Sequence, residues 1–351
     1  MERQKSGIPH GLISSAFIGL VILIIIILVR FVANAYIQRV VIGIGINLIL
    51  VVALNLINGY TGVFSLGHIG FMAIGAYTAA ILTLPVAQKK TNLPDLPGFL
   101  ANVELGFLPA TIIAGLFAMI IAVLVGYSLM RLSGPYVGVA TMGFLIITRV
   151  VLINWDTITL GAKTFSGVPQ YSDIWWVTGW AIFTIYIVWR IVHSSFGRRM
   201  IAVRDNEIAA QSLGISILSA RLLAFAISAF FTAVAGSLWA HFIMSFSPKS
   251  FYFAETFSVI TMLVVGGMGS VSGSVMGVGL ISILSEILRN AERGANLGFM
   301  QIPPLYGASQ LLMAVLFILV MIFRPTGLMG GKEFSFNWLH RLFEPKKEKR
   351  R

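Results

Sequence analysis

Long apolar runs fill most of the chain, and short polar segments separate them. A transmembrane helix needs about 20 predominantly apolar residues, and most of these runs approach that length. The pattern predicts ten spanning segments, at residues 12–30, 39–58, 62–84, 107–129, 135–153, 174–193, 221–243, 256–267, 272–288 and 304–323. It therefore indicates an all-α polytopic membrane protein with about ten transmembrane helices, some of which could be broken or re-entrant.

Composition agrees with this fold class. Hydrophobic residues make up 57% of the chain and charged residues 11%, whereas a soluble domain carries about 25% charged residues. The chain has no cysteine, which excludes disulfides, thiolate metal sites and thiol catalysis in this chain. The apolar run at 12–30 is long and no small-residue cleavage pattern follows it, so we expect a retained span rather than a signal peptide.

The distribution of charge predicts an orientation. Ten spans place both termini on one side, and putting that side in the cytoplasm leaves most Lys and Arg residues inside. Arg30 and Arg39, which flank an outer turn, are a local exception. This bias and a basic cytoplasmic tail at 331–351 account for the net charge of +12. We therefore expect contact with membrane lipid and no binding of nucleic acid.

One charged segment, Gly197–Leu223, interrupts two apolar runs. Within it Glu207, Ala209 and Ala210 precede Gly214, a pattern that predicts a short helix with a small-residue face and a glycine stop. Arg204 lies just before this helix. The predicted orientation places the segment in the cytoplasm, where a soluble partner could grip it.

A second unusual segment, residues 55–77, carries polar groups in or beside the membrane. Such groups are costly in lipid, so they are expected to face the bundle interior or an aqueous path. Glycines at 59 and 62 would permit a break whose backbone groups line a cavity. Tight packing alone is the alternative, and we assign no chemistry to His68. The candidate residues of a solute pathway are Asn58, Tyr60, Thr61 and Ser65.

Glycines recur at positions that favour close helix packing. Gly67 and Gly70 lie in the second segment, and a doubled G-x-x-x-G pattern runs through Gly269, Gly273 and Gly277. The two glycine-rich turns, at 58–65 and 266–273, hint weakly at an internal duplication. Further along the same helix, Glu286 is expected to pair with Arg289.

Several signatures are missing from the sequence. It contains no G-x-x-x-x-G-K-[ST] loop, so this chain is not expected to bind or hydrolyse ATP, and it contains no H-E-x-x-H motif or cluster of His and carboxylates. No span carries the charges typical of an ion-driven carrier. An ion-coupled carrier or channel and a membrane-embedded transferase are therefore disfavoured. If the protein moves a solute uphill, the energy must enter from outside this chain.

Four blocks of sequence, in order, resemble the permease subunits of branched-chain amino acid ABC importers, of the LivM type. The first resembles the family's LNL…GYxGxxSLGHxxFMxIGAY block, the second its SGxYFAxxTLxF block and the third its GRAxxAIRxNExAAxxxGINxxxxKLxAF loop. The fourth resembles its closing LVVGGxGSxxGxxxGA…FRPxGLxG pattern. The blocks lie at Asn55–Tyr77, at Ser133–Phe144, at Gly197–Phe225, and at Met262–Glu286 with Tyr306–Gly330.

The resemblance implies a permease domain at 1–330 in the inner membrane of a bacterium or archaeon. It implies a second homologous permease, two cytoplasmic ABC ATPase subunits that bind the ATP, and a periplasmic or lipid-anchored solute-binding protein. No cofactor is expected in this chain. The coupling loop, which sits in a groove of the ATPase, would comprise Arg204, Glu207, Ala209, Ala210 and Gly214.

The resemblance leaves the solute partly open. Branched-chain amino acids are expected, with urea, short amides and other amino acids as alternatives within the family. The family's outer Thr-Gly-Gly-x-x-Gly-Leu motif is incomplete, because one of its glycines is lost in the stretch Thr159–Val168. If that loop touches the solute or the binding protein, specificity could differ.

Overall fold

The computed structural model describes residues 34–292, 307–324, 326–330 and 333. These residues form helices and no strand, apart from one isolated bridge between Phe165 and Phe246. Six described helices are long and apolar enough to cross a membrane, or seven if one bent pair counts as a single span. The all-α polytopic class is confirmed, whereas the count of ten spans is not. The expected span at 12–30 lies outside the described residues.

The long helices begin and end close to the predicted positions. They are α2 (Ala35–Asn58), α6 (Phe107–Leu129), α7 (Tyr136–Asn154), α9 (Ile174–Val192), α12 (Ile217–Ile243) and α14 (Val271–Glu292). Helices of intermediate length are α3 (His68–Thr83), α13 (Phe253–Gly266) and α15 (Ala308–Phe323). The short elements are α4 (Val86–Asn92), α5 (Gly98–Ala101), α8 (Asp156–Thr159), α10 (Ser195–Asp205), α11 (Glu207–Ser212) and the 3₁₀ turn η1 (Pro248–Ser250).

Two of the predicted spans differ from the helices observed. The span expected at 62–84 begins only at His68, because residues 59–67 form no helix, and α4 then bends by 115° from α3. The span expected at 256–267 corresponds to α13, which has 14 residues. At 1.5 Å per residue α13 is about 21 Å long, shorter than the about 30 Å of a hydrocarbon core.

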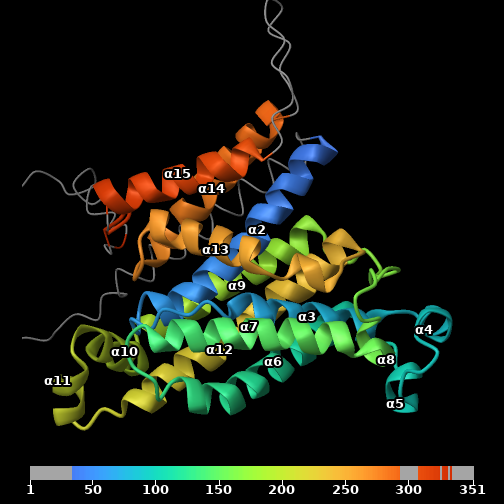
Figure 1. The fold of residues 1–351 in the computed structure, drawn as a ribbon, viewed down its shortest axis with the longest axis horizontal. Helices are drawn as coiled ribbons and strands as arrows, with labels where there is room; N and C mark the ends of the chain where they lie inside the picture. The colour runs from blue at the N-terminus through green and yellow to red at the C-terminus, as the bar shows by residue number, and fades with distance from the viewer. Residues whose placement is uncertain (1–33, 293–306, 325, 331–332, 334–351) are drawn as a thin grey trace, which may run out of the picture.

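Helix α12 lies at the centre of the bundle and packs against α2, α3 and α6 (Figure 1). Helices α13, α14 and α15 form a second group, which contacts the first mainly through α2. The pair α10–α11 lies at one end of the molecule, and α4, α5 and α8 lie at the opposite end. The second end is called the far end below.

Glycines allow the two central helices to touch through their backbones. A Cβ atom on Gly75 of α3 would overlap the carbonyl oxygen of Ala233 on α12, and one on Gly236 of α12 would overlap that of Met72 on α3. Without a strong hydrophobic drive between helices in lipid, such small-residue contacts supply much of the packing. Helices α3 and α12 are therefore joined along a backbone-to-backbone seam.

Of the five glycines predicted to serve helix packing, four lie in two pairs, each pair against a neighbouring helix. Gly67 and Gly70 approach α7. A Cβ atom on Gly67 would lie 2.5 Å from the carbonyl oxygen of Thr141, and one on Gly70 would lie 3.1 Å from the ring of Phe144. Gly273 and Gly277 of α14 pack tightly on α13. Gly269 lies before α14 rather than on it, in a turn with φ +79°, and there it packs closely against Gly59.

Candidate functional site

The charged segment predicted to form one short helix forms two, α10 and α11. The Ser194 hydroxyl caps α10 by accepting from the amide of Phe196 at 3.2 Å. The Asn206 side chain caps α11 by accepting from the Ala209 amide at 3.0 Å. Gly214, at φ +77°, ends α11. The predicted helix and its glycine stop are confirmed, and the Ser194 cap is the sequence signal that reveals α10.

The outward surface of α11 is not the expected small-residue face. Ala210 is buried against Val203, whereas Ala209 faces solvent. The side chains that project most are Ile208 and Leu213, which are 78% and 79% exposed. Two aliphatic side chains are therefore exposed on this otherwise charged segment.

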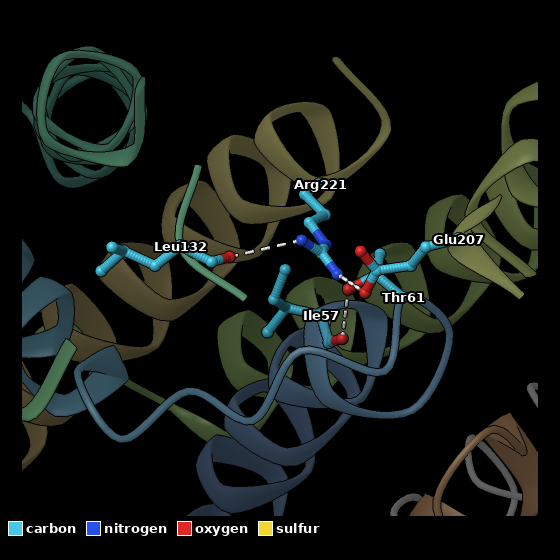
Figure 2. Close-up of polar contacts among 5 residues, drawn as sticks. All are labelled: Ile57, Thr61, Leu132, Glu207 and Arg221. Atoms are coloured by element: carbon cyan, nitrogen blue, oxygen red, sulfur yellow. Dashed lines mark hydrogen bonds and ion pairs between the residues drawn. The ribbon is translucent and has the colours of Figure 1, made fainter. Parts of the chain in front are cut away.

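Glu207 points inward to the body of the protein, where it forms an ion pair with Arg221 of α12 (Figure 2). The Arg221 side chain is 7% exposed, and the same guanidinium donates to the carbonyl of Leu132 in the turn before α7 at 3.4 Å. A buried arginine needs such partners, because an unpaired charge in a protein interior is strongly unfavourable. This pair fixes α11 to the central helix.

Arg204, at the end of α10, makes a second attachment. Its guanidinium donates to the Gly59 carbonyl at 3.1 Å and pairs with Asp205 at 2.9 Å. Its stem covers Gly62, where a Cβ atom would lie 2.9 Å from Arg204 Cγ. The predicted coupling segment and the predicted pathway motif are therefore in direct contact, a proximity that sequence reasoning did not anticipate.

The break between α2 and α3 is held by polar groups from the same segment. Its four predicted pathway residues are all buried: Asn58, Tyr60, Thr61 and Ser65. The Ser65 amide donates to Asn58 Oδ1 at 3.1 Å, and the Thr61 hydroxyl donates to the Ile57 carbonyl at 2.6 Å. Within the described residues, Asn58 Nδ2 has no hydrogen-bond partner. The break thus exists as predicted, and most of its polar groups satisfy one another.

His68 joins this break to the central helix. One ring nitrogen lies 3.0 Å from the Ser65 hydroxyl and the other 2.7 Å from the Ser228 hydroxyl on α12. Ser228 in turn donates to the Ala53 carbonyl at 2.5 Å. Both ring nitrogens are occupied by neighbours in the fold, as expected for a packed histidine.

A second break, between α13 and α14, lies against the first. The Asn55 side chain accepts from the Gly269 amide at 2.8 Å and donates to the Ser270 carbonyl at 2.8 Å and the Ser274 hydroxyl at 2.9 Å. A Cβ atom on Gly59 would overlap the Gly269 amide. The two glycine-rich turns noted in the sequence therefore meet in space, whether or not they arose by duplication.

Glu333 is a contributor that sequence reasoning missed. Its carboxylate accepts from the amides of Val271 and Ser272, at 2.7 and 3.1 Å, and from the Tyr60 hydroxyl at 3.2 Å. A carboxylate at a helix N-terminus meets free amides and the positive end of the helix dipole. Glu333 thereby joins Tyr60 in the first break to the start of α14 at the second, and no local sequence pattern predicts this contact.

Two charged side chains of α14 pair with each other. The predicted pair of Glu286 and Arg289 is confirmed, with Nη2 and Oε2 2.6 Å apart. Across the described part of the chain, no group of three His, Asp or Glu side chains could hold a metal ion. Among described residues, the arrangement supports mechanical coupling between segments better than catalysis.

Comparison with known proteins agrees with this picture. The family model described as "Branched-chain amino acid transport system / permease component" matches residues 36–323. The LivM permease protein of a high-affinity branched-chain amino acid transport system in Escherichia coli K12 is 31% identical over 81% of this chain and 68% of its own. A probable LivM protein of Methanocaldococcus jannaschii is 23% identical, over 82% of this chain and 91% of its own.

A more distant relative serves a different system. The LsrC permease protein of an autoinducer 2 import system in Escherichia coli is 27% identical over 43% of this chain and 47% of its own. No solved structure matches the chain. The family match covers the α2–α3 break, α10–α11 and the α13–α14 break. With the 31% identity to LivM, it shows that this chain belongs to the family of permease components of branched-chain amino acid transport systems.

Proposed function

We propose that this chain is the permease subunit of an ATP-driven ABC importer that carries leucine, isoleucine and valine across the inner membrane. Residues 1–330 would form the permease domain and 331–351 a basic cytoplasmic tail. Both termini would lie in the cytoplasm. A second permease, two ATPase subunits that bind ATP and a solute-binding protein would complete the transporter.

The observation that carries the proposal is the double attachment of the α10–α11 segment. Glu207 ties it to α12 through Arg221, and Arg204 ties it to the α2–α3 break through Gly59. Ile208 and Leu213 remain exposed at its surface. The α10–α11 segment is bound to the bundle on one side and exposes apolar side chains on the other. Such a segment is suited to transmit force from a soluble partner.

Transport would then proceed by alternating access. Closure of the ATPase dimer would displace α11, and the Glu207–Arg221 pair would carry that displacement to α12 as a rigid-body motion. Asn58, Tyr60, Thr61 and Ser65 are our candidates for the inner part of the solute path. Asn58 Nδ2, buried with no partner among the described residues, is the group best placed to gain a hydrogen bond from a solute or water.

The solute is proposed from the relatives. LivM relatives belong to branched-chain amino acid systems, and the more distant LsrC relatives to autoinducer 2 import. Urea, short amides and other amino acids remain alternatives. The glycines kept in the loop 154–173, Gly161 and Gly167, both have positive φ, so this loop retains its turns despite the lost glycine.

The test is uptake of labelled leucine, isoleucine, valine and urea by the assembled transporter, with and without ATP. Ile208→Ser combined with Leu213→Ser should abolish ATP-dependent uptake and the binding of the ATPase subunit, while the permease still reaches the membrane. Gln211→Ala on the same helix is the control and should transport normally. Uptake that survives ATP depletion, or survives the double substitution, would contradict the proposal.

A further inference from the structure

Two loops meet at the far end of the bundle, one before α9 and one after α12. The amide of Phe165 donates to the Phe246 carbonyl at 2.7 Å, and the Phe246 amide donates back at 3.0 Å. The Val168 amide donates to the Met244 carbonyl at 3.3 Å. Loops 160–173 and 244–252 are therefore fastened to each other through their backbones, although about 80 residues of chain separate them.

Three phenylalanine side chains of these loops are buried at this end of the bundle. Phe165 and Phe251 are each 1% exposed, and Phe246 is also buried. Tyr77 of α3 lies beneath them, with its ring centroid 5.8 Å from that of Phe165 and 5.0 Å from that of Phe246, both edge-on. Trp239 of α12 packs on Phe251 at 5.1 Å. We call these five residues the aromatic clasp.

Loop side chains are normally exposed, so three buried phenylalanines require an explanation. Edge-to-face packing explains the cohesion of the clasp. It does not explain why two loops, rather than a helix, cover Tyr77 of α3 and Trp239 of α12.

Each loop begins at the C-terminus of a helix, α8 or α12, with left-handed backbone. Met244 at φ 63° and Leu160 at φ 61° are the non-glycine residues with left-handed backbone in the described part of the chain, and each lies in one of the two loops. Neither side chain favours that conformation. The Tyr77 hydroxyl, buried under the clasp, has no hydrogen-bond partner among described residues. Separation of the loops would let water reach this hydroxyl.

We propose that the aromatic clasp is the gate at the far end of the solute pathway, closed in this conformation, with Tyr77 as the polar group that opening uncovers. The inference rests on the proposed transport function. An open clasp would present aromatic surface and one hydroxyl, which suits a solute with an aliphatic side chain and a polar end.

Helix α12 connects this gate to the α10–α11 segment. Arg221, which pairs with Glu207, and Trp239 of the clasp lie on the same uninterrupted helix. They are roughly five turns, about 27 Å, apart along it. A tilt of α12 imposed at α11 would therefore displace Trp239, and Tyr77 of the attached α3, relative to the phenylalanines of the two loops.

The absence of cysteine from the natural chain makes a covalent test direct. Phe165→Cys with Phe246→Cys places one thiol in each loop at a hydrogen-bonded antiparallel pair, whose Cα atoms are about 5.5 Å apart and within disulfide range. The complete transporter is reconstituted in proteoliposomes, and ATP-driven leucine uptake is measured before oxidation, after it, and after dithiothreitol. We expect uptake to fall to the level seen without ATP and to recover on reduction.

The single variants Phe165→Cys and Phe246→Cys form no internal bridge, so the uptake of each, at whatever level the substitution itself sets, should be the same before and after the oxidant. If the two loops are fully cross-linked and uptake is unchanged, the proposal that the clasp is a gate is wrong. Failure of the cysteine-free parent to take up any of the tested solutes with ATP would instead refute the proposed function.

A second readout does not depend on the solute. Tyr77→Cys in the assembled transporter is exposed to a membrane-impermeant maleimide, without nucleotide and after trapping with ATP and vanadate. Labelling should differ between the two states, while Ser166→Cys on the exposed loop surface should label in both. Equal labelling of Tyr77→Cys in both states would contradict the gate.

Discussion

The pair of Glu207 and Arg221 yields the sharpest prediction. In Glu207→Ala the Arg221 guanidinium, 7% exposed, would lose its carboxylate partner. Its other contact is a 3.4 Å bond to the Leu132 carbonyl, and its Nε atom has no partner among described residues. The variant would thus leave a nearly isolated charge in the interior.

The magnitude follows from the unequal exposure of the partners. Breaking a fully buried ion pair costs about 3–5 kcal/mol, and breaking a solvent-exposed pair costs about 0.2–1 kcal/mol. The Glu207 side chain is 41% exposed, so water can partly replace it beside Arg221. We expect Glu207→Ala to lower the free energy of unfolding by about 1–3 kcal/mol.

A second substitution should undo part of this loss. Arg221→Met removes the buried charge and keeps most of the side-chain volume, and replacing both members of a buried pair by apolar residues is often nearly neutral. The double variant should therefore be more stable than Glu207→Ala alone, by about 1 kcal/mol. Both variants should lose coupled uptake, because α11 is released from α12 in each.

The assay is a double-mutant cycle on the purified permease, with unfolding in mixed micelles as the measure of stability. Gln211→Ala, on the same helix and without a partner in the body of the protein, is the matched control. Additive losses, with the double variant less stable than either single variant, would refute the reasoning. Such a result would mean that Arg221 reaches water freely or that the pair does not persist.

Three further predictions test the packing and the contact surface. Gly75→Ala should reduce the yield of folded protein and lower the free energy of unfolding by about 1–3 kcal/mol through overpacking, while Gly179→Ala on α9, where a Cβ atom meets nothing within 4 Å, should leave stability unchanged. Ile208→Ser with Leu213→Ser should leave thermal stability unchanged and abolish co-purification of the ATPase subunit. A variant that loses stability but still binds the ATPase subunit would contradict an exposed docking surface. Asn55→Leu removes the acceptor of the Gly269 amide in the interior and should lower the free energy of unfolding by about 1–3 kcal/mol. Chemical unfolding would measure this loss against the wild-type chain.

Local sequence signals predicted much of the structure. The Glu207–Gly214 pattern predicted α11 and its end, because a capping asparagine and a glycine stop act within one turn. The glycines at 59 and 62 predicted the break before α3, because polar groups and glycines weaken a membrane helix at that point. Both features depend on neighbours within a few residues.

The contacts between distant segments could not be predicted in the same way. Glu207 and Ala210 were assigned to the coupling loop, but the sequence did not predict that Glu207 pairs with Arg221 or that Ala210 is buried beside Val203. No periodicity in the sequence links Glu333 to Tyr60, or Phe165 to Phe246. These pairings depend on how the helices are arranged, which apolar runs of similar hydropathy do not encode individually.

The two attachments of α10–α11 restrict how the bundle can move. A single contact would let the segment pivot, whereas contacts to both Arg221 and Gly59 oblige α12 and the end of α2 to follow it together. The seam at Gly75 and Gly236 leaves no space for α3 to slide against α12, so α3 must follow as well. Any displacement of α11 therefore reaches the aromatic clasp with α3 and α12 moving as one body, and the loops that carry its phenylalanines are the parts left free to separate from them.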